Sequence, residues 1–154
     1  GQIGELYASG PMIVNGYWHN PEATAATFSD GWVRTGDLAW LDEEGFCYIA
    51  DRAKDIVIRG GENIYSSEVE NVLYDHPAVM DSAVVGIPYR TLGEDPAVVH
   101  LTPGQSATEA ELQDWVRERL AAFKVPVRIL FYPETLPRNA NGKILKKDLK
   151  ALFA

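Results

Sequence analysis

The chain has 154 residues, of which 46% are hydrophobic and 23% are charged, and its formal net charge is −8 at pH 7. This length is enough for one domain, or for a domain with an appendage, and the apolar fraction is enough for a packed core. The acidic balance argues against general nucleic-acid binding. The sequence contains no run of about 18 apolar residues, so we expect no membrane span.

Residues 1–50 read as strands and turns with one short helix. Asn20 is a good N-cap and Pro21 suits the first helical position, which predicts a helix over residues 21–28. Extended segments are expected at residues 3–8, 14–18, 36–41 and 45–49. The last two are predicted to pair as a hairpin. A segment this short buries little core alone, so we expect it to be the β-rich end of a larger domain.

After Asp51 the pattern changes to that of a compact domain, expected over residues 56–154. Ser67 and Glu70 match a capping box that begins a helix, and Thr108 and Glu111 match a second one. Apolar residues follow at helical spacing in both segments, namely Val69, Val72 and Leu73 in the first and Leu112, Trp115, Val116 and Leu120 in the second. A closing helix is predicted over residues 145–153.

The strands expected in this domain alternate with its helices. A short strand at residues 55–59 precedes the first helix, and Gly60-Gly61 ends it. Further strands are expected at residues 79–87, 96–101 and 128–132. This order predicts an α+β domain with a three-stranded sheet flanked by helices.

The cysteine and histidine residues give no sign of a disulfide bond or a metal site. Cys47 is the only cysteine, so it forms no internal disulfide and fits a reducing, cytoplasmic location. The three histidines are scattered without metal-ligand spacing, so we predict no metal site among these residues. The chain opens with Gly1 and not with Met, although recognisable patterns already run by Gly4. We therefore expect it to be part of a longer protein.

Several polar residues could serve a ligand or could be ordinary surface features. Asp37 could accept two hydrogen bonds from a vicinal diol, or it could cap a turn. Arg52 offers a planar fork of donors, or it forms a surface ion pair. Lys143 carries a flexible ammonium in a glycine-containing loop. The basic segment 138–150 could bind a small anion, or it could be a solvated helix face.

Three sequence blocks carry a family resemblance. They are TGDL at residues 35–38, DRAKDIVIRGGENIY at 51–65 and PRNANGKI at 137–144. In this order they resemble the C-terminal third of the adenylate-forming enzymes, which include acyl-CoA synthetases, peptide-synthetase adenylation domains and luciferases. The resemblance runs from about Gly4 to Leu149. It implies that residues 56–154 are a C-terminal AMP-binding-enzyme lid domain and that residues 1–50 end a large N-terminal domain.

The resemblance also implies roles for individual residues. Asp37 and Arg52 would bind the ribose of ATP, and Lys143 would be the catalytic lysine of adenylation. Lys54 would be the hinge, within a hinge segment at residues 51–55, about which the small domain swings between two reaction steps. Gly60, Gly61 and Glu62, which follow the hinge segment in the sequence, would line the tunnel for the pantetheine of CoA.

The implied function is that of an acyl-CoA synthetase acting on a carboxylic acid, and we expect a fatty acid. Its substrates would be the acid, ATP and CoA, and its partner would be the remainder of the N-terminal domain. The family's phosphate loop, acyl pocket and magnesium-binding glutamate are not in this sequence, so Mg²⁺ is expected to be liganded outside it and the chain alone to be inactive. Two alternatives stay open: an adenylation domain that loads a carrier protein, and a non-catalytic interaction module.

Overall fold

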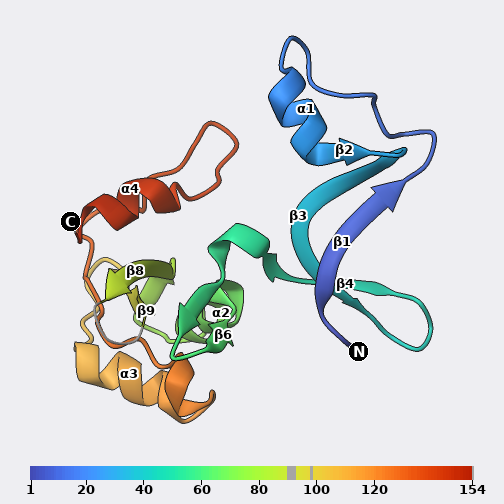
Figure 1. Ribbon diagram of the computed structural model, residues 1–154. Coiled ribbons are helices and arrows are strands. Elements are labelled where there is room, and N and C mark those ends of the chain that lie inside the picture. Colours follow the sequence, from blue (N-terminus) through green and yellow to red (C-terminus); the bar gives the residue numbers. More distant parts are fainter. Residues whose placement is uncertain (90–92, 98, 154) are drawn as a thin grey trace. The chain divides into compact units, whose positions relative to one another are not determined.

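The computed structural model describes residues 1–89, 93–97 and 99–153, which form two compact units (Figure 1). The first unit is Gly1–Lys54 and the second is Asp55–Ala154. The division therefore falls within the segment 51–55 for which the sequence predicts a hinge. Each unit is described separately below.

The first unit is built on an antiparallel sheet around one long strand. Strand β3 (Trp32–Leu41) pairs with β1 (Gly4–Ser9) along one edge and with β2 (Phe28–Ser29) and β4 (Cys47–Arg52) along the other. The predicted hairpin is thus confirmed as β3 and β4, although β3 begins earlier than expected. Among the described residues of this unit, Ala39 is the only buried hydrophobic residue.

Helix α1 (Pro21–Thr27) forms as predicted. The Asn20 side chain accepts a hydrogen bond from the backbone N–H of Ala23 at 3.1 Å, and Pro21 occupies the first turn. The strand predicted over residues 14–18 is wrong. The backbone N–H of Tyr17 donates to the hydroxyl of Thr24 at 2.9 Å, so this segment is tied to the helix and not to a neighbouring strand.

The described residues of the second unit form two antiparallel sheets. The larger one has the strand order β6 (Glu62–Ile64), β5 (Val57–Arg59), β9 (Gly93–Ala97) and β8 (Val85–Tyr89). The smaller one pairs β10 (His100–Leu101) with β7 (Val79–Asp81). The α+β class is confirmed, but the main sheet has four strands and not the predicted three. The additional strand is β6, which follows the Gly60-Gly61 turn and was not predicted.

The described part of this unit has three α-helices: α2 (Ser66–Tyr74), α3 (Glu109–Arg117) and α4 (Lys146–Ala151), the last shorter than predicted. Helix α2 contacts β7, α4 contacts β8, and α3 packs against α2. One-turn 3-10 helices occur at η1 (Ala53–Asp55) and η2 (Ala122–Lys124). The core joins helix and strand residues, including Val57, Ile64, Val69, Leu73 and Leu112, all with no exposed surface. The indole N–H of Trp115 donates to the carbonyl of Val72 at 2.8 Å and ties α3 to α2.

Two predicted strands of this unit differ from the structure. The segment 79–87 is broken into β7 and β8, and residues 128–132 contribute an isolated bridge between Tyr132 and His100 in place of a strand. The backbone N–H of Ile129 donates to the carboxylate of Glu109 at 2.8 Å, so a side chain satisfies it. The predicted strand at residues 96–101 includes residue 98, which lies outside the described residues.

The capping box predicted for α3 is present. The Thr108 hydroxyl accepts a hydrogen bond from the backbone N–H of Glu111 at 3.2 Å, and the Glu111 carboxylate accepts one from the backbone N–H of Thr108 at 2.7 Å. The box predicted for α2 is wrong, because the N-cap is Tyr65 and no side chain caps it.

Replacing Glu111 by glutamine is expected to destabilise the second unit at neutral pH and to have less effect in acid. The hydrogen bonds from the backbone and hydroxyl of Thr108 lower the pKa of Glu111. A folded-state pKa below the unfolded one gives a stabilisation that is complete above the unfolded-state pKa and is lost as pH falls through the folded-state pKa. Urea unfolding midpoints of both proteins across a pH series measure this. A midpoint difference that does not change with pH would contradict it.

Candidate functional site

The register of β3 and β4 brings two predicted site residues of the first unit together. Asp37 and Arg52 are cross-strand partners, and the guanidinium Nε of Arg52 lies 3.0 Å from Oδ1 of Asp37. This is an ion-pair distance, but the Nε–H makes no hydrogen bond of acceptable geometry, so the contact is mainly electrostatic. The two side chains are 39% and 33% exposed, which leaves both groups accessible to a ligand.

The backbone around this pair is fixed by hydrogen bonds. The Thr35 hydroxyl donates to the carbonyl of Leu6 at 2.8 Å and accepts from the backbone N–H of Asp37 at 3.1 Å. Gly36, between them, has φ = 73°, a conformation that favours glycine. The Thr35 carbonyl accepts from Arg52 at 3.3 Å. Sequence analysis missed this role of Thr35, because only the pairing of β1 with β3 brings its hydroxyl to Leu6.

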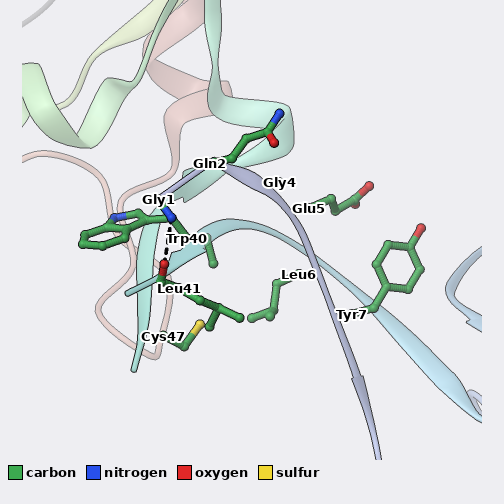
Figure 2. A pocket seen from close by; sticks show the side chains of 10 residues that line it. Gly1, Gln2, Gly4, Glu5, Leu6, Tyr7, Trp40, Leu41 and Cys47 are labelled. Carbon is green, nitrogen blue, oxygen red and sulfur yellow. Dashed lines mark hydrogen bonds between the residues drawn. The ribbon is translucent and has the colours of Figure 1, made fainter. Parts of the chain in front are cut away.

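Two of the hollows on the first unit are lined by residues of both β1 and β3. One, of about 370 Å³, is lined in part by Thr35, Gly36, Arg52 and Lys54 and so adjoins the Asp37–Arg52 pair. Figure 2 shows the other, where the ammonium group of Gly1 donates to the carbonyl of Leu41 at 2.9 Å. That second hollow contains none of the residues predicted to act in function.

Lys54 is the last residue of the first unit and lies in the 3-10 helix η1. Its side chain is exposed. The position joins two compact units, which is where a hinge residue would be required.

Gly60 and Gly61 form the turn between β5 and β6. Their φ angles are 60° and 87°, which suit glycine in a tight hairpin turn. No described atom lies within 4 Å of where a side chain would begin at either residue, so the turn is open. Glu62 follows it on β6 and is exposed. A thin ligand could approach the backbone here without displacing a side chain.

Lys143 is held near the end of a tight loop, drawn in red-orange ahead of α4 in Figure 1. The Asn139 side-chain carbonyl accepts from the backbone N–H groups of Asn141 at 3.0 Å and of Lys143 at 2.9 Å. The backbone N–H of Gly142 donates to the carbonyl of Asn139 at 2.9 Å. The Lys143 side chain is exposed, and its ammonium forms no ion pair with the described residues.

The other basic residues of the segment 138–150 are not equivalent to Lys143. Arg138 pairs with Asp81, and Lys146 lies 2.8 Å from the carboxylate of Glu70. Lys147 and Lys150 are exposed on α4, outside the loop. Only part of this segment is therefore free to meet an anion.

Neither a metal centre nor a membrane-spanning helix is found where the structure describes the chain. Within the described residues no three His, Cys, Asp or Glu side chains gather as they would around a metal ion. No helix in the same part of the chain is both long enough and apolar enough to cross a bilayer.

Residues 68–143 match the model of the AMP-binding enzyme C-terminal domain, and this part of the chain belongs to that family. The match ends on Lys143. The structure also superposes on o-succinylbenzoate CoA synthetase from Bacillus subtilis. With the acyl-adenylate intermediate bound the TM-score is 0.89, and with ATP and magnesium ion it is 0.88. In both cases the identity is 41%, and the match covers 97% of this chain and 30% of that one.

Two curated relatives align with nearly the whole length of this chain. The chain is 49% identical over 153 residues to the 2-succinylbenzoate–CoA ligase of Geobacillus kaustophilus, covering 99% of this chain and 31% of the ligase. It is 50% identical over 147 residues to the long-chain-fatty-acid–CoA ligase of Bacillus subtilis, covering 95% of this chain and 26% of that ligase. The chain thus spans less than a third of the length of either relative.

Proposed function

We propose that this chain acts as part of an acid–CoA ligase that joins a carboxylic acid to CoA at the expense of ATP. The observation that carries the proposal is an exposed Lys143, with no ion pair to the described residues, on a hydrogen-bonded loop inside a segment that belongs to the AMP-binding enzyme C-terminal family. The relatives are named as CoA ligases, and the solved neighbour is seen with an acyl-adenylate. Both support the same chemistry.

In the first step the substrate carboxylate oxygen attacks the α-phosphorus of ATP, and the bond to pyrophosphate breaks. Negative charge gathers on the oxygens around that phosphorus, where a positioned ammonium is most effective. We assign this role to Lys143. Asp37 would accept hydrogen bonds from the ribose hydroxyls, and Arg52 beside it would hold the same sugar through its donor fork.

In the second step the thiol of CoA gives up its proton and attacks the acyl carbonyl, and AMP leaves. The open turn at Gly60 and Gly61, with Glu62 after it, is our candidate contact for the pantetheine arm. Lys54 is our candidate hinge, about which the second unit would swing to bring that turn to the acyl-adenylate. Mg²⁺ would neutralise phosphate charge in the first step, held by residues other than those described here.

The acid itself is the finer part of the proposal. We propose a fatty or related carboxylic acid, supported by the 50% identity to a long-chain-fatty-acid–CoA ligase. The comparable identity to a 2-succinylbenzoate–CoA ligase makes an aromatic acid the competing substrate. The full enzyme assayed with both acids distinguishes them by the ratio of the two kcat/KM values.

The first unit also needs a covering partner, which we propose to be the remainder of a large N-terminal domain. Met12 and Trp18 are 92% and 89% exposed, and Ala39 is the only buried hydrophobic residue among those described in the unit. Large apolar side chains left in water on a sheet with so little core favour packing against further protein. We propose a cytoplasmic location, consistent with the free thiol of Cys47.

A chimera tests the function directly. In it this chain replaces the matching segment of the Geobacillus 2-succinylbenzoate–CoA ligase, and we expect ATP-dependent pyrophosphate release and formation of the CoA thioester. The isolated 154-residue chain is expected to release no pyrophosphate with ATP and any fatty acid, because its sequence has no phosphate loop.

The outcomes of that experiment separate the alternatives. A folded chimera that forms the adenylate but transfers it only to a carrier protein would favour the carrier-loading adenylation domain. A folded chimera with neither step would favour a non-catalytic interaction module. Ligase activity in the isolated chain would contradict the expectation that the phosphate loop and the acyl pocket lie outside this sequence.

A further inference from the structure

We propose that Arg138 and Asp81 form an anchor that positions the Lys143 loop for adenylation, so that Arg138 is a positioning residue of this reaction. The inference rests on the proposed role of Lys143. It concerns a different question, namely how a lysine on an exposed loop is kept where it can act.

Arg138 makes two contacts that join the loop to the body of the second unit. One terminal nitrogen, Nη1, donates to the carbonyl of Gly142 at 2.6 Å, immediately before Lys143. The other, Nη2, pairs with the carboxylate of Asp81. One guanidinium therefore closes the loop on itself and ties it to a strand far away in sequence.

The other end of the anchor is itself fixed. Asp81 ends β7, where it pairs with His100 of β10, and its carboxylate also accepts the backbone N–H of Ser82 at 3.1 Å. Its side chain is only 19% exposed, against 42% for Arg138. A carboxylate held by the backbone N–H of the next residue gives the arginine a defined partner, unlike a surface ion pair between two mobile side chains.

Among the described residues the other hydrogen bonds of the loop are internal, and Ile144 at its end packs against the core. Asn139 ties the turn together, and the backbone N–H of Leu145 donates to the carbonyl of Pro137 at 2.8 Å. These contacts fix the shape of the loop, but they do not fix where it stands relative to β7. Since misplacing a catalytic group by about 1 Å can cost a hundredfold in rate, the orientation of the whole loop matters.

The fork of an arginine suits this task and the single ammonium of a lysine does not. Arg138 uses separate nitrogens for Gly142 and Asp81, and a lysine would have to meet both from one atom. Arg138→Lys should therefore keep the charge and lose the dual contact. In the full-length enzyme we expect adenylation to slow by about ten- to a hundredfold. Thioester formation from supplied acyl-adenylate should be unchanged.

The chain offers a matched control in Arg117→Lys. Arg117 also pairs with an aspartate, Asp114, and it lies on α3 away from the loop (Figure 1). This variant should adenylate at the wild-type rate. Asp81→Asn removes the other half of the anchor and should slow adenylation as Arg138→Lys does. Circular dichroism and thermal unfolding of each variant show whether it is folded.

A double-mutant cycle distinguishes positioning from general structural support. If Arg138 acts through Lys143, then Arg138→Lys should have no further effect on adenylation in a Lys143→Ala background. Independent, multiplicative losses would overturn the inference. So would a folded Arg138→Lys variant that adenylates at the wild-type rate while Lys143→Ala is impaired. If Lys143→Ala is itself unimpaired, the proposed role of Lys143 fails first, and the anchor has nothing to position.

Discussion

Replacing Lys143 by alanine in the full-length enzyme is expected to slow acyl-adenylate formation about a hundredfold and to spare thioester formation from supplied acyl-adenylate. Charge develops around the α-phosphate only in the first step, and one well-placed cationic contact is worth roughly 3 kcal/mol there. The Lys143 ammonium is exposed and meets no carboxylate among the described residues, so it is free to meet a phosphate. Single-turnover measurements of the two half-reactions give the comparison.

Lys147→Ala is the matched control for this prediction. Lys147 is an exposed lysine nearby in sequence, but it lies on α4 and outside the loop. Its removal changes the net charge by the same amount, so general electrostatics would affect both variants alike. If Lys143→Ala slows both half-reactions equally, this lysine supports structure. If Lys147→Ala slows adenylation as much as Lys143→Ala does, the effect comes from the loss of a positive charge and not from the position of Lys143.

The sequence predicted best those elements whose signals are satisfied locally. Asn20 caps helix α1 because its side chain accepts a hydrogen bond from the backbone N–H of Ala23, three positions along. Thr108 caps helix α3, and its capping partner, Glu111, is equally close in sequence. In both cases the residues that form the pattern also form the hydrogen bonds, and no distant contact is needed to complete them.

The predictions failed where a distant partner took the same group. Ser67 and Glu70 match a capping box, but the Glu70 carboxylate accepts the backbone N–H of Val84 at 2.6 Å and pairs with Lys146. Those contacts also explain why segment 79–87 is not one strand. The Val84 N–H and the Ser82 hydroxyl both bond to Glu70 on α2, which interrupts the strand between β7 and β8.

In the candidate site, too, local sequence patterns gave predictions, whereas contacts with distant residues could not be predicted. Asp37, Arg52 and Lys143 are proposed as site residues from the sequence blocks that contain them, and their roles stay predictions. Their surroundings could not be predicted. The pairing of Asp37 with Arg52 depends on the register of two strands, and the Arg138–Asp81 contact joins residues 57 positions apart. Register and long-range contacts follow from packing of the whole unit, which a local pattern does not contain.

Replacing Lys54 by proline in the full-length enzyme is expected to stop transfer of the acyl group to CoA while adenylation continues. Proline fixes φ near −65°, so a hinge that must rotate its backbone at this residue would be held in one arrangement. Lys54 lies in the one-turn helix η1 at the end of the first unit, and we expect both units to stay folded. We expect the arrangement for the first step to be the resting one. The Gly60-Gly61 turn could then no longer reach the acyl-adenylate, and acyl-adenylate should accumulate in single-turnover assays.

Lys54→Ala separates the backbone effect from the loss of the ammonium. Alanine removes the charge but leaves φ free, so this variant should complete both half-reactions, whereas the proline variant completes only the first. Proline also disfavours helical backbone at Ala53, so circular dichroism must show that the proline variant is folded before its rates are compared. If folded Lys54→Pro enzyme carries out both steps at wild-type rates, the backbone does not rotate at Lys54. If Lys54→Ala loses transfer as well, the ammonium and not the freedom of the backbone is what the second step requires.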